Sequence, residues 1–271
     1  MLTIESVTYR YAGAPRPSLY DVSIDLGKGE VVGVVGASEA GKTTLCLVAS
    51  GLAPRTVGGV LDGRILLDGA ETAPLAMHQL AERVGIVFAS PATQLSGVAG
   101  TVYEEIAFGP MNLGLPRAEV IARTEGALAA LGIEDLAARD PSRLSGGQQQ
   151  LVAIGGLLAM RPTHLVLDEP TAQLDPAGTR LVADALARLA AGGASILVAE
   201  HKTDLLAAIC TRVVVLEAGR IALAGPAAEV LSDPRLPELG VAAPSFVRLR
   251  RAATAAGLAK AAVVRLAEAV R

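Results

Sequence analysis

A glycine-rich segment near the start of the chain has the residue types of a phosphate-binding loop. Residues 36–43 read GASEAGKT and fit the pattern G-x-x-x-x-G-K-[ST]. The glycines let backbone N–H groups turn inward around a phosphate chain, at a helix start whose dipole favours anions. Lys42 is placed to reach the β- and γ-phosphates, and Thr43 to ligate Mg²⁺. The expected nucleotide contacts are Gly36, Ala37, Ser38, Glu39, Ala40, Gly41, Lys42, Thr43 and Thr44.

Two adjacent carboxylates, Asp168 and Glu169, follow the apolar run HLVL. Carboxylates at the end of a buried strand are costly unless cations or hydrogen bonds meet them. Asp168 is suited to hold Mg²⁺ through a water, and Glu169 to polarise an attacking water. Two solvated acids at a strand end are the alternative for this pair alone. Together with the phosphate loop, the pair predicts Mg²⁺-dependent hydrolysis of a nucleoside triphosphate.

A second candidate anion site lies in RLSGGQQQL, residues 143–151. Ser145 and the amides of Gly146 and Gly147 begin an expected helix, which makes them suited to bind an anion. A serine N-cap before a glutamine-rich helix is the alternative interpretation. The chain therefore has two candidate phosphate sites but one evident triphosphate pocket.

The elements that position these residues alternate between strand and helix. Five apolar, branched runs are typical of fully buried parallel strands: RILLDG, RVGIVF, HLVLDE, ASILVAE and RVVVLEAG. Alanine- and leucine-rich stretches with helical spacing separate them, such as residues 179–193, which end in glycine. This alternation predicts an α/β sheet with helices on both faces.

Three other segments depart from that alternation. Residues 2–9 and 20–26 alternate apolar and polar positions, which predicts an antiparallel layer. Between about residues 101 and 140 the strand pattern disappears, which indicates a helical insertion. The tail after Gly240 is basic and alanine-rich, which predicts a helix or a helix pair.

Composition restricts the class of protein. The 271 residues carry a formal net charge of −3, which argues against a broad nucleic-acid surface, so we expect no nucleic-acid partner. No apolar run is long enough to span a bilayer, and the N-terminus has no signal-peptide pattern. Cys46 and Cys210 lie in apolar segments, which is typical of reduced core thiols in a cytosolic protein.

Together these motifs resemble the ATP-binding subunits of ABC transporters, over about residues 3–233. LSGGQ (144–148) matches the signature motif of that family, and QLDP (173–176) matches its D-loop. His201 matches the switch histidine, and Tyr11 stands where the family places an aromatic ring under the adenine. The resemblance implies an α/β, P-loop NTPase ABC ATPase domain with an antiparallel β layer and a helical subdomain. It also implies ATP and Mg²⁺ as cofactors.

The same resemblance implies a second ATPase subunit as partner. In this family two domains pair head to tail, and the signature of one closes over the nucleotide held by the other. That role falls on Ser145, Gly146, Gly147 and Gln148. Asp175 is expected to bridge the subunits, with a plain helix N-cap as the alternative. His201 is expected to touch the γ-phosphate and Glu169, with a surface histidine as the alternative; Tyr11 has a plain strand aromatic as its alternative.

A narrower resemblance is to the ATPases of energy-coupling factor importers. It rests on residues 50–69 (SGLAPRTVGGVLDGRILLDG), 101–116 (TVYEEIAFGPMNLGLP) and 158–178, and on AEHKTD. It implies a transmembrane coupling subunit and a substrate-binding membrane subunit as partners, at the cytoplasmic face of the cell membrane. The implied division is an ATP-binding domain over 1–239, with its helical subdomain at about 101–140, and a helical extension over 240–271. An ABC ATPase for another solute, or a weakly hydrolysing regulatory module, is the alternative.

Two positions depart from the family pattern. VFASPATQ (87–94) places Ala89 where the family has the Q-loop glutamine that meets Mg²⁺ and the attacking water. Gln94 matches a second glutamine of that pattern and is a candidate to replace the missing contact in part. Leu151 follows the signature where a basic residue is usual. The first departure predicts slow hydrolysis, and the second is of small consequence.

Overall fold

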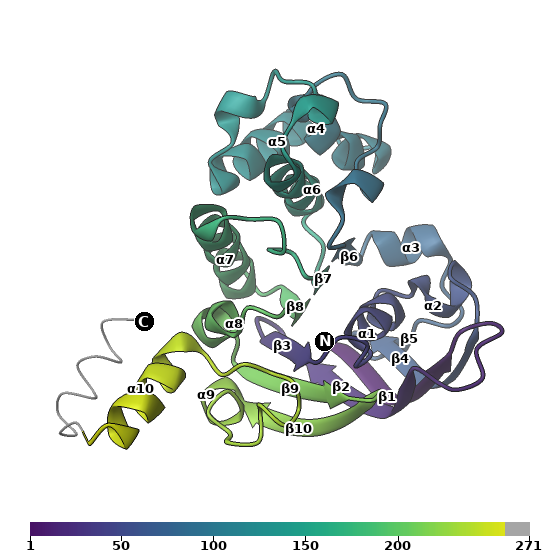
Figure 1. Cartoon of the computed structure of the whole chain (residues 1–271). Coiled ribbons are helices and arrows are strands. Elements are labelled where there is room, and N and C mark those ends of the chain that lie inside the picture. The colour runs from purple at the N-terminus through teal and green to yellow at the C-terminus, as the bar shows by residue number, and fades with distance from the viewer. Residues whose placement is uncertain (258–271) are drawn as a thin grey trace.

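The computed structural model of the chain describes residues 1–257. Its central sheet has six strands (Figure 1). The strand order is β10-β9-β3-β8-β7-β6, with β10 antiparallel to its neighbour and the others parallel. The strands are β3 (Val31–Gly36), β6 (Val84–Val87), β7 (His164–Asp168), β8 (Ser195–Ala199), β9 (Arg212–Glu217) and β10 (Arg220–Pro226). Four of the five runs expected as parallel strands lie here, and β3, β7 and β8 are buried along their whole length.

A four-stranded antiparallel sheet forms the second β layer, in the order β2-β1-β4-β5. Its strands are β1 (Leu2–Arg10), β2 (Leu19–Leu26), β4 (Val60–Leu67) and β5 (Ala70–Glu71). The expectation of an antiparallel layer from residues 2–9 and 20–26 is confirmed. The expectation that residues 64–69 form a buried parallel strand is wrong, because they end β4, where Ile4 pairs with Ile65 in antiparallel register. In this run Ile65 and Leu67 are buried and Arg64 is exposed, the alternation of a half-buried strand.

Helix α1 (Lys42–Ala49) lies between the two sheets. Its apolar side chains, among them Leu45, Cys46 and Val48, are fully buried against side chains from both sheets. This burial holds the first turn of the helix, and the glycine loop before it, firmly against the end of β3. Two short helices, α2 (Leu52–Arg55) and α3 (Met77–Ala81), follow along the same side.

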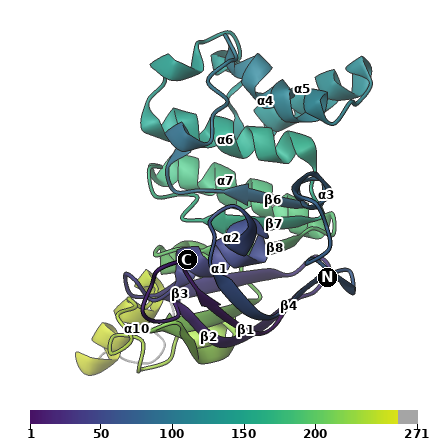
Figure 2. The same ribbon diagram turned by 90° about the vertical axis from the view of Figure 1, so that its right-hand side faces the viewer.

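Helices cover the other face of the central sheet and continue into a separate layer (Figure 2). Next to the sheet are α6 (Gly146–Met160), α7 (Pro176–Ala191) and α8 (Thr203–Ile209), while α4 (Val102–Asn112) and α5 (Arg117–Leu131) pack on α6. Short 3₁₀ turns lie at Pro91–Thr93, Glu134–Leu136 and Pro141–Arg143. The side chains of Ile106, Leu131 and Ile154 are completely buried where α4, α5 and α6 meet. Residues 101–140 thus contain helices and turns, and α6 extends the helical layer to Met160.

The C-terminal part of the described chain adds α9 (Ala227–Val230) and α10 (Ser245–Ala255). Helix α10 lies beside α8 (Figure 1). The helix expected after Gly240 therefore begins at Ser245. The rest of that expected extension, residues 258–271, lies outside the described residues.

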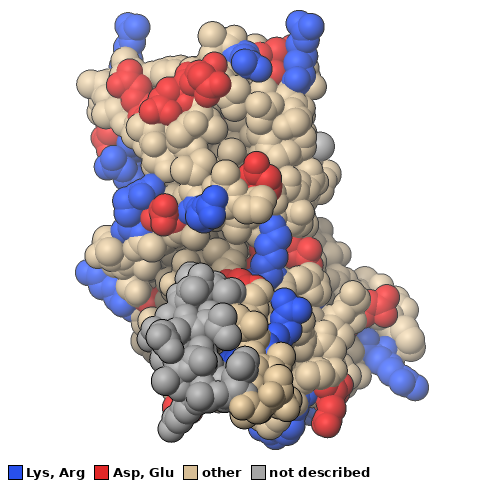
Figure 3. All heavy atoms as spheres, turned by 60° about the vertical axis from the view of Figure 1, so that its left-hand side comes forward, with Lys and Arg blue, Asp and Glu red and all other residues tan. Residues whose placement is uncertain are grey.

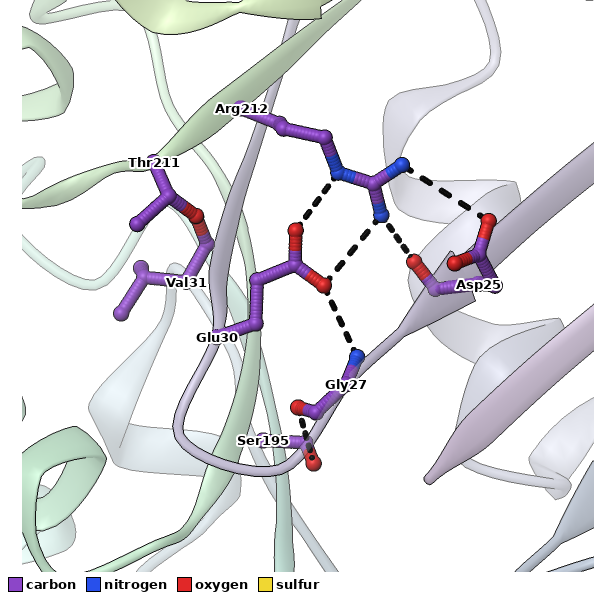
Figure 4. Close-up of polar contacts among 7 residues, drawn as sticks. All are labelled: Asp25, Gly27, Glu30, Val31, Ser195, Thr211 and Arg212. Carbon is purple, nitrogen blue, oxygen red and sulfur yellow. Dashed lines mark hydrogen bonds and ion pairs between the residues drawn. The ribbon is translucent and has the colours of Figure 1, made fainter.

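A group of polar contacts joins the strand ends that lie opposite the glycine loop (Figure 4). The Glu30 carboxylate accepts hydrogen bonds from Nε of Arg212, at 2.6 Å, and from the Gly27 amide, at 2.8 Å. The Arg212 guanidinium also donates to the carbonyl oxygen of Asp25. The Ser195 hydroxyl donates to the carbonyl oxygen of Gly27 at 2.9 Å. These bonds link the ends of β2, β3, β8 and β9, which fixes where β3 delivers its glycine loop.

The two cysteine side chains lie within the fold: Cys46 is buried and Cys210 is half-buried. Both cysteines are free, and burial raises the pKa of each thiol above its usual value.

On the face drawn in Figure 3, Lys and Arg side chains are scattered among Asp and Glu side chains and do not merge into one basic surface. Every helix in residues 1–257 is too short or too polar to span a membrane.

Candidate functional site

The glycine loop leaves the C-terminal end of β3 and closes at the first residue of α1. A Cβ on Gly36 would lie 2.4 Å from the carbonyl oxygen of Leu216, so no side chain fits there. Gly41 has a φ of +106°, which favours glycine, and a Cβ there would lie 2.9 Å from the Ser18 carbonyl. The loop encloses a cavity of about 370 Å³, lined by Ser18, Ser38, Glu39, Gly41, Lys42, Thr43, Thr44, Glu169 and His201.

Lys42 is the cation of this cavity. Its Nζ donates to the carbonyl oxygens of Gly36 and Ala37, each at 3.0 Å. Burial lowers the pKa of Lys42, while the nearby carboxylates of Glu169 and Asp168 act in the opposite direction. Phosphate oxygens are stronger acceptors for an ammonium group than neutral carbonyls, so Lys42 is suited to move from its own loop to a phosphate.

Asp168 and Thr43 supply oxygen atoms beside Lys42. Asp168 is 4% exposed, and burial raises the pKa of its carboxyl group, while a hydrogen bond with the Thr43 side chain lowers it. Its Oδ1 atom is buried and has no hydrogen-bond partner among the described residues. An unpartnered buried carboxylate oxygen next to a hydroxyl fits a hard divalent cation such as Mg²⁺, which uses one or two protein oxygens plus phosphates and water. Among residues 1–257, no group of three or more His, Cys, Asp or Glu side chains is placed to hold a metal ion.

Glu169 and His201 face each other across the mouth of the cavity. The Nε2 atom of His201 lies 3.1 Å from Oε1 of Glu169, and the two side chains are 48% and 29% exposed respectively. Glu169 has a φ of +50°, a left-handed conformation at the residue after β7, and its amide donates to the Ala199 carbonyl at 2.8 Å. A partly exposed carboxylate held in this way can accept a proton from water, with the imidazole as a second polar contact.

Charged residues on either side of His201 form a hydrogen-bond network that the sequence analysis missed. The Glu200 carboxylate is 2% exposed and accepts from the Thr171 hydroxyl at 2.8 Å and from the His201 amide at 3.0 Å. Nζ of Lys202 donates to the carbonyls of Thr171, at 2.7 Å, and Leu174, at 3.2 Å. The triplet Glu-His-Lys directly after a buried strand was the available signal. The network fixes the loop that carries His201 to the loop that follows Glu169.

Tyr11 lies at the edge of the glycine loop. Its hydroxyl is 3.0 Å from Oγ1 of Thr44, and its ring meets that of Tyr9 edge to face, with the centroids 5.0 Å apart. The side chain is partly exposed. The structure thus brings Tyr11 next to residues 36–44, as an aromatic partner for a nucleotide base requires.

The signature residues lie apart from this cavity. Ser145 caps α6: its Oγ accepts from the Gln148 amide at 3.3 Å, and Gln148 Oε1 accepts from the Ser145 amide at 3.1 Å. Ser145 and Gly146 are exposed, and no residue from 145–148 lines the cavity. Asp175 is exposed and caps α7 by accepting from the Gly178 amide at 2.7 Å. Residues 145–148 and Asp175 therefore lie at the starts of α6 and α7, outside the lining of the cavity.

The segment that contains Ala89 also contains Gln94, whose side-chain amide is bonded to the backbone. Gln94 donates to the Ile86 carbonyl at 2.7 Å and accepts from the Phe88 amide at 3.1 Å. Both ends of this side chain are therefore bound to backbone, so Gln94 is not free to take the place of a glutamine at position 89. The Gln173 amide group lies 3.5 Å from the Ala89 carbonyl.

The loop, the carboxylate pair and the parallel sheet define a phosphate-loop ATPase. The family model described as "ABC transporter" matches residues 19–172. The chain therefore belongs to the ABC transporter family, as one of its ATP-hydrolysing domains. The expected α/β fold class, with its antiparallel layer and helical subdomain, is confirmed.

Curated relatives include ABC transporter ATP-binding proteins. One from Methanosarcina acetivorans is 41% identical over 92% of this chain, which spans only 41% of the relative's length. The cobalt import ATP-binding protein CbiO of Rhodobacter capsulatus is 43% identical over 86% of this chain and 81% of its own. The energy-coupling factor transporter ATP-binding protein EcfA of M. acetivorans is 39% identical over 92% of this chain and 88% of its own. The chain thus spans about two fifths of the longer relatives and most of the others.

Solved structures agree with this membership. The structure of cbiO1 from Clostridium perfringens, part of the ABC transporter complex cbiONQ, has a TM-score of 0.75 and 34% identity, covering 88% of this chain and 96% of that one. A dimeric post-hydrolysis state of the ATP-binding cassette MJ0796, bound to ADP and Pi, has a TM-score of 0.74 and 25% identity, covering 84% of this chain and 99% of that one.

Proposed function

We propose that the chain is the ATP-binding and ATP-hydrolysing subunit that energises an energy-coupling factor importer, for a vitamin, a thiamine precursor or a cobalt-like solute. The similarity to EcfA, across most of the length of both chains, is the observation that carries this proposal. Similarity to CbiO supports the same class. The subunit would work at the cytoplasmic face of the membrane. Residues 1–239 would form the ATPase domain and residues 240–271 its helical extension.

The site residues divide the work of phosphoryl transfer to water. The loop amides of residues 36–43 and the Lys42 ammonium bind and orient the triphosphate, and Tyr11 packs against the base. Thr43 and Asp168 would hold Mg²⁺, which neutralises charge on the phosphate oxygens when it is bound. Glu169 accepts a hydrogen bond from the attacking water. His201 donates from Nε2 and keeps the Glu169 carboxylate in place.

A head-to-tail dimer gives the exposed start of α6 its role. Ser145 and the amides of Gly146 and Gly147 are suited to bind an anion, and none of these residues lines the chain's own triphosphate cavity. In the proposed dimer, these groups and Gln148 contact the γ-phosphate held by the partner, and Asp175 meets the partner at the same interface. The dimeric structure of the similar cassette MJ0796 supports this arrangement.

The coupling subunit would dock on the outer helical layer. A hollow of about 260 Å³ lies between this layer and β6, with Leu95, Phe108 and Met160 among its lining residues. Phe108 is 41% exposed, and Met111, on the same helix, is 62% exposed. An apolar groove next to residues 87–94 is suited to receive a helix from a membrane partner. Movement of that segment on ATP binding would then reach the partner directly.

The dimer part of the proposal is tested with Glu169→Gln, which removes the base but keeps the shape of the site. With saturating MgATP, and with a second ATPase subunit present if one is encoded beside it, the variant should shift from monomer to dimer in light scattering. The double variant Glu169→Gln/Lys42→Ala is the control and should stay monomeric. A Glu169→Gln variant that stays monomeric under both conditions would contradict the sandwich.

The importer class is tested by purifying the assembled complex from membranes. The expected result is a complex with a transmembrane coupling subunit and a small membrane subunit that binds the solute. A complex that instead uses a soluble substrate-binding protein would assign the chain to another class of ABC importer.

A second candidate function is a regulatory nucleotide-binding module that hydrolyses slowly. It is favoured by one observation: the methyl side chain of Ala89 can neither hydrogen-bond to water nor ligate Mg²⁺, and the side chain of the nearby Gln94 is bound to backbone. Turnover numbers separate the two candidates, because a module that energises transport must hydrolyse ATP at the rate of import.

A further inference from the structure

Residues 239–245, which we call the strap, follow α9 and end at the first residue of α10. The strap is anchored in the core by Val241 and Ala243, each 5% exposed, within the large apolar cluster that also contains α6 and α7 residues. All of it except Leu239 belongs to the tail that the sequence analysis separated from the ATPase domain. Its contacts are with two loops that carry site residues.

The first contact of the strap is with the glycine loop. Gly240 has a φ of +70°, and a Cβ placed on it would lie 2.9 Å from Cβ of Ala37 and 3.5 Å from its Cα. Real Cβ atoms do not approach this closely, so the two backbones meet only because residue 240 has no side chain. Ala37 is the residue whose carbonyl accepts from Lys42 at 3.0 Å. The strap therefore lies directly against the residue of the loop whose carbonyl binds Lys42.

The second contact is with the loop that carries His201. The Thr203 hydroxyl, 4% exposed, donates to the Ala242 carbonyl at 2.8 Å. Asp204 accepts from the Ser245 amide at 2.7 Å and from its hydroxyl at 2.8 Å. Thr203 and Asp204 begin α8, two and three residues after His201. These bonds fix the start of α8, and with it the loop before α8, to the strap.

We propose that the strap is a positioning element of the ATP site, which sets the glycine loop and the His201 loop at their working separation. Gly240 acts through Ala37 on the loop that binds phosphate. Thr203 acts through the start of α8 on His201. Neither residue lines the cavity at Lys42, so both are positioning residues. The inference rests on the proposed function, because it assumes that the cavity at Lys42 binds MgATP.

The two contacts should affect different kinetic constants. Gly240→Ala pushes on Ala37 and should weaken MgATP binding and raise KM by about tenfold, since sub-ångström displacement of binding groups is costly. Thr203→Val should lower kcat by about tenfold with little change in MgATP affinity, because it loosens only the His201 side. Matched controls are available. Gly114 has a φ of +68° and nothing within 4 Å of a Cβ, and the Thr254 hydroxyl donates to the Arg250 carbonyl at 2.8 Å on the surface of α10.

The experiment measures MgATP affinity by calorimetry, KM, kcat and melting temperature for the full chain and its variants. Gly114→Ala and Thr254→Val should match the wild type in affinity, KM and kcat. The decisive arm is Gly240→Ala combined with Ala37→Gly, which removes the 2.9 Å clash and should restore most of the affinity that Gly240→Ala loses. Equal losses in Gly240→Ala and Gly114→Ala, or no recovery in the double variant, would overturn the strap.

If Gly240→Ala does not fold, the Thr203→Val and Thr254→Val pair decides the question on its own: equal kcat values refute the inference. Failure of the proposed function is distinguishable from failure of the strap. A wild-type chain that binds no MgATP refutes the proposed function and the strap with it, whereas normal wild-type binding with unaffected strap variants refutes the strap alone.

Discussion

The Nε2 atom of His201 lies 3.1 Å from Oε1 of Glu169, at the mouth of the cavity that contains Lys42. The two residues follow adjacent parallel strands, β8 and β7, whose carboxyl ends meet at one edge of the sheet. Glu169 has a left-handed backbone conformation directly after β7. In the proposed mechanism, Glu169 is the base for water and His201 holds its carboxylate in place.

Removing the imidazole should slow the chemical step. We expect His201→Ala to lower kcat by about 10²-fold, within the range for loss of an acid–base group, and to change MgATP affinity little. His78→Ala is the matched control, because His78 is exposed on α3 and lies outside the site. Steady-state hydrolysis and calorimetry check both expectations. Equal kcat for the two variants would remove His201 from the mechanism.

Restoring a glutamine at position 89 should accelerate hydrolysis. A methyl group cannot position water or ligate Mg²⁺, and loss of one positioning contact in the transition state costs up to about 10²–10³ in rate. We expect Ala89→Gln to raise kcat by about tenfold or more with little change in MgATP affinity. We also expect the wild-type chain to prefer a non-identical partner subunit that has the glutamine. An unchanged or lower kcat would show that position 89 is not the water-positioning site.

Asp168 should trade stability for function. Burial raises the pKa of this carboxyl above its ordinary value of 3.8. As pH rises, the unfolded chain therefore loses this proton before the folded chain does. Ionisation of Asp168 thus lowers the free energy of unfolding, and the full loss is reached above the pKa of the folded state. In nucleotide-free protein, Asp168→Asn should raise the free energy of unfolding at pH 7 by about 1 kcal/mol, because it removes a buried charge whose Oδ1 atom has no hydrogen-bond partner among the described residues. The gain should shrink as pH falls toward 3.8.

Denaturant unfolding at several pH values checks this stability effect. Asp184→Asn, at an exposed position on α7, is the control and should show no such gain. The same Asp168→Asn variant should bind MgATP at least about tenfold more weakly, since it loses a charged ligand for the cation. A less stable variant with normal Mg²⁺ dependence would contradict the role given to Asp168.

Coupling to the membrane partner should depend on the apolar groove lined by Phe108 more than on the nearby carboxylates of Glu104 and Glu105. Glu104 accepts from the Thr101 amide at 3.0 Å, and Glu105 accepts from the Ser96 amide and hydroxyl at 2.6 Å each. Charge reversal at these acids would therefore disturb the local fold. The exposed Phe108 makes a better test. Phe108→Asp should abolish solute uptake while MgATP binding and melting temperature stay normal; normal uptake would contradict the groove as the docking site.

Most of the site could be predicted from the sequence because its chemistry is local. The glycines at positions 36 and 41, Lys42 and the carboxylate pair each occupy short motifs whose backbone requirements select particular residue types. The geometry confirms those requirements: no Cβ fits at Gly36, and Gly41 has a positive φ. The parallel strands β7 and β8 were equally clear, because burial on both faces gives continuous apolar runs.

Other features depend on contacts between distant segments. The run RILLDG is as apolar as the parallel strands, and only its pairing with β1 shows that it belongs to the antiparallel sheet. The backbone bonds of Gln94, the Glu200 network and the contact of Gly240 with Ala37 each join residues that no local pattern relates. Sequence spacing gives no signal for such contacts.

The most direct test of the central claim, that the cavity at Lys42 is the ATP site, is calorimetric titration of MgATP into the wild-type chain and into Lys42→Ala. We expect one binding site in the wild type, and at least about 100-fold weaker binding in the variant, because a charge-assisted bond to phosphate is worth roughly 3 kcal/mol. Melting temperatures without nucleotide should show that the variant is folded. Equal affinity in the two proteins, with both folded, would contradict the account.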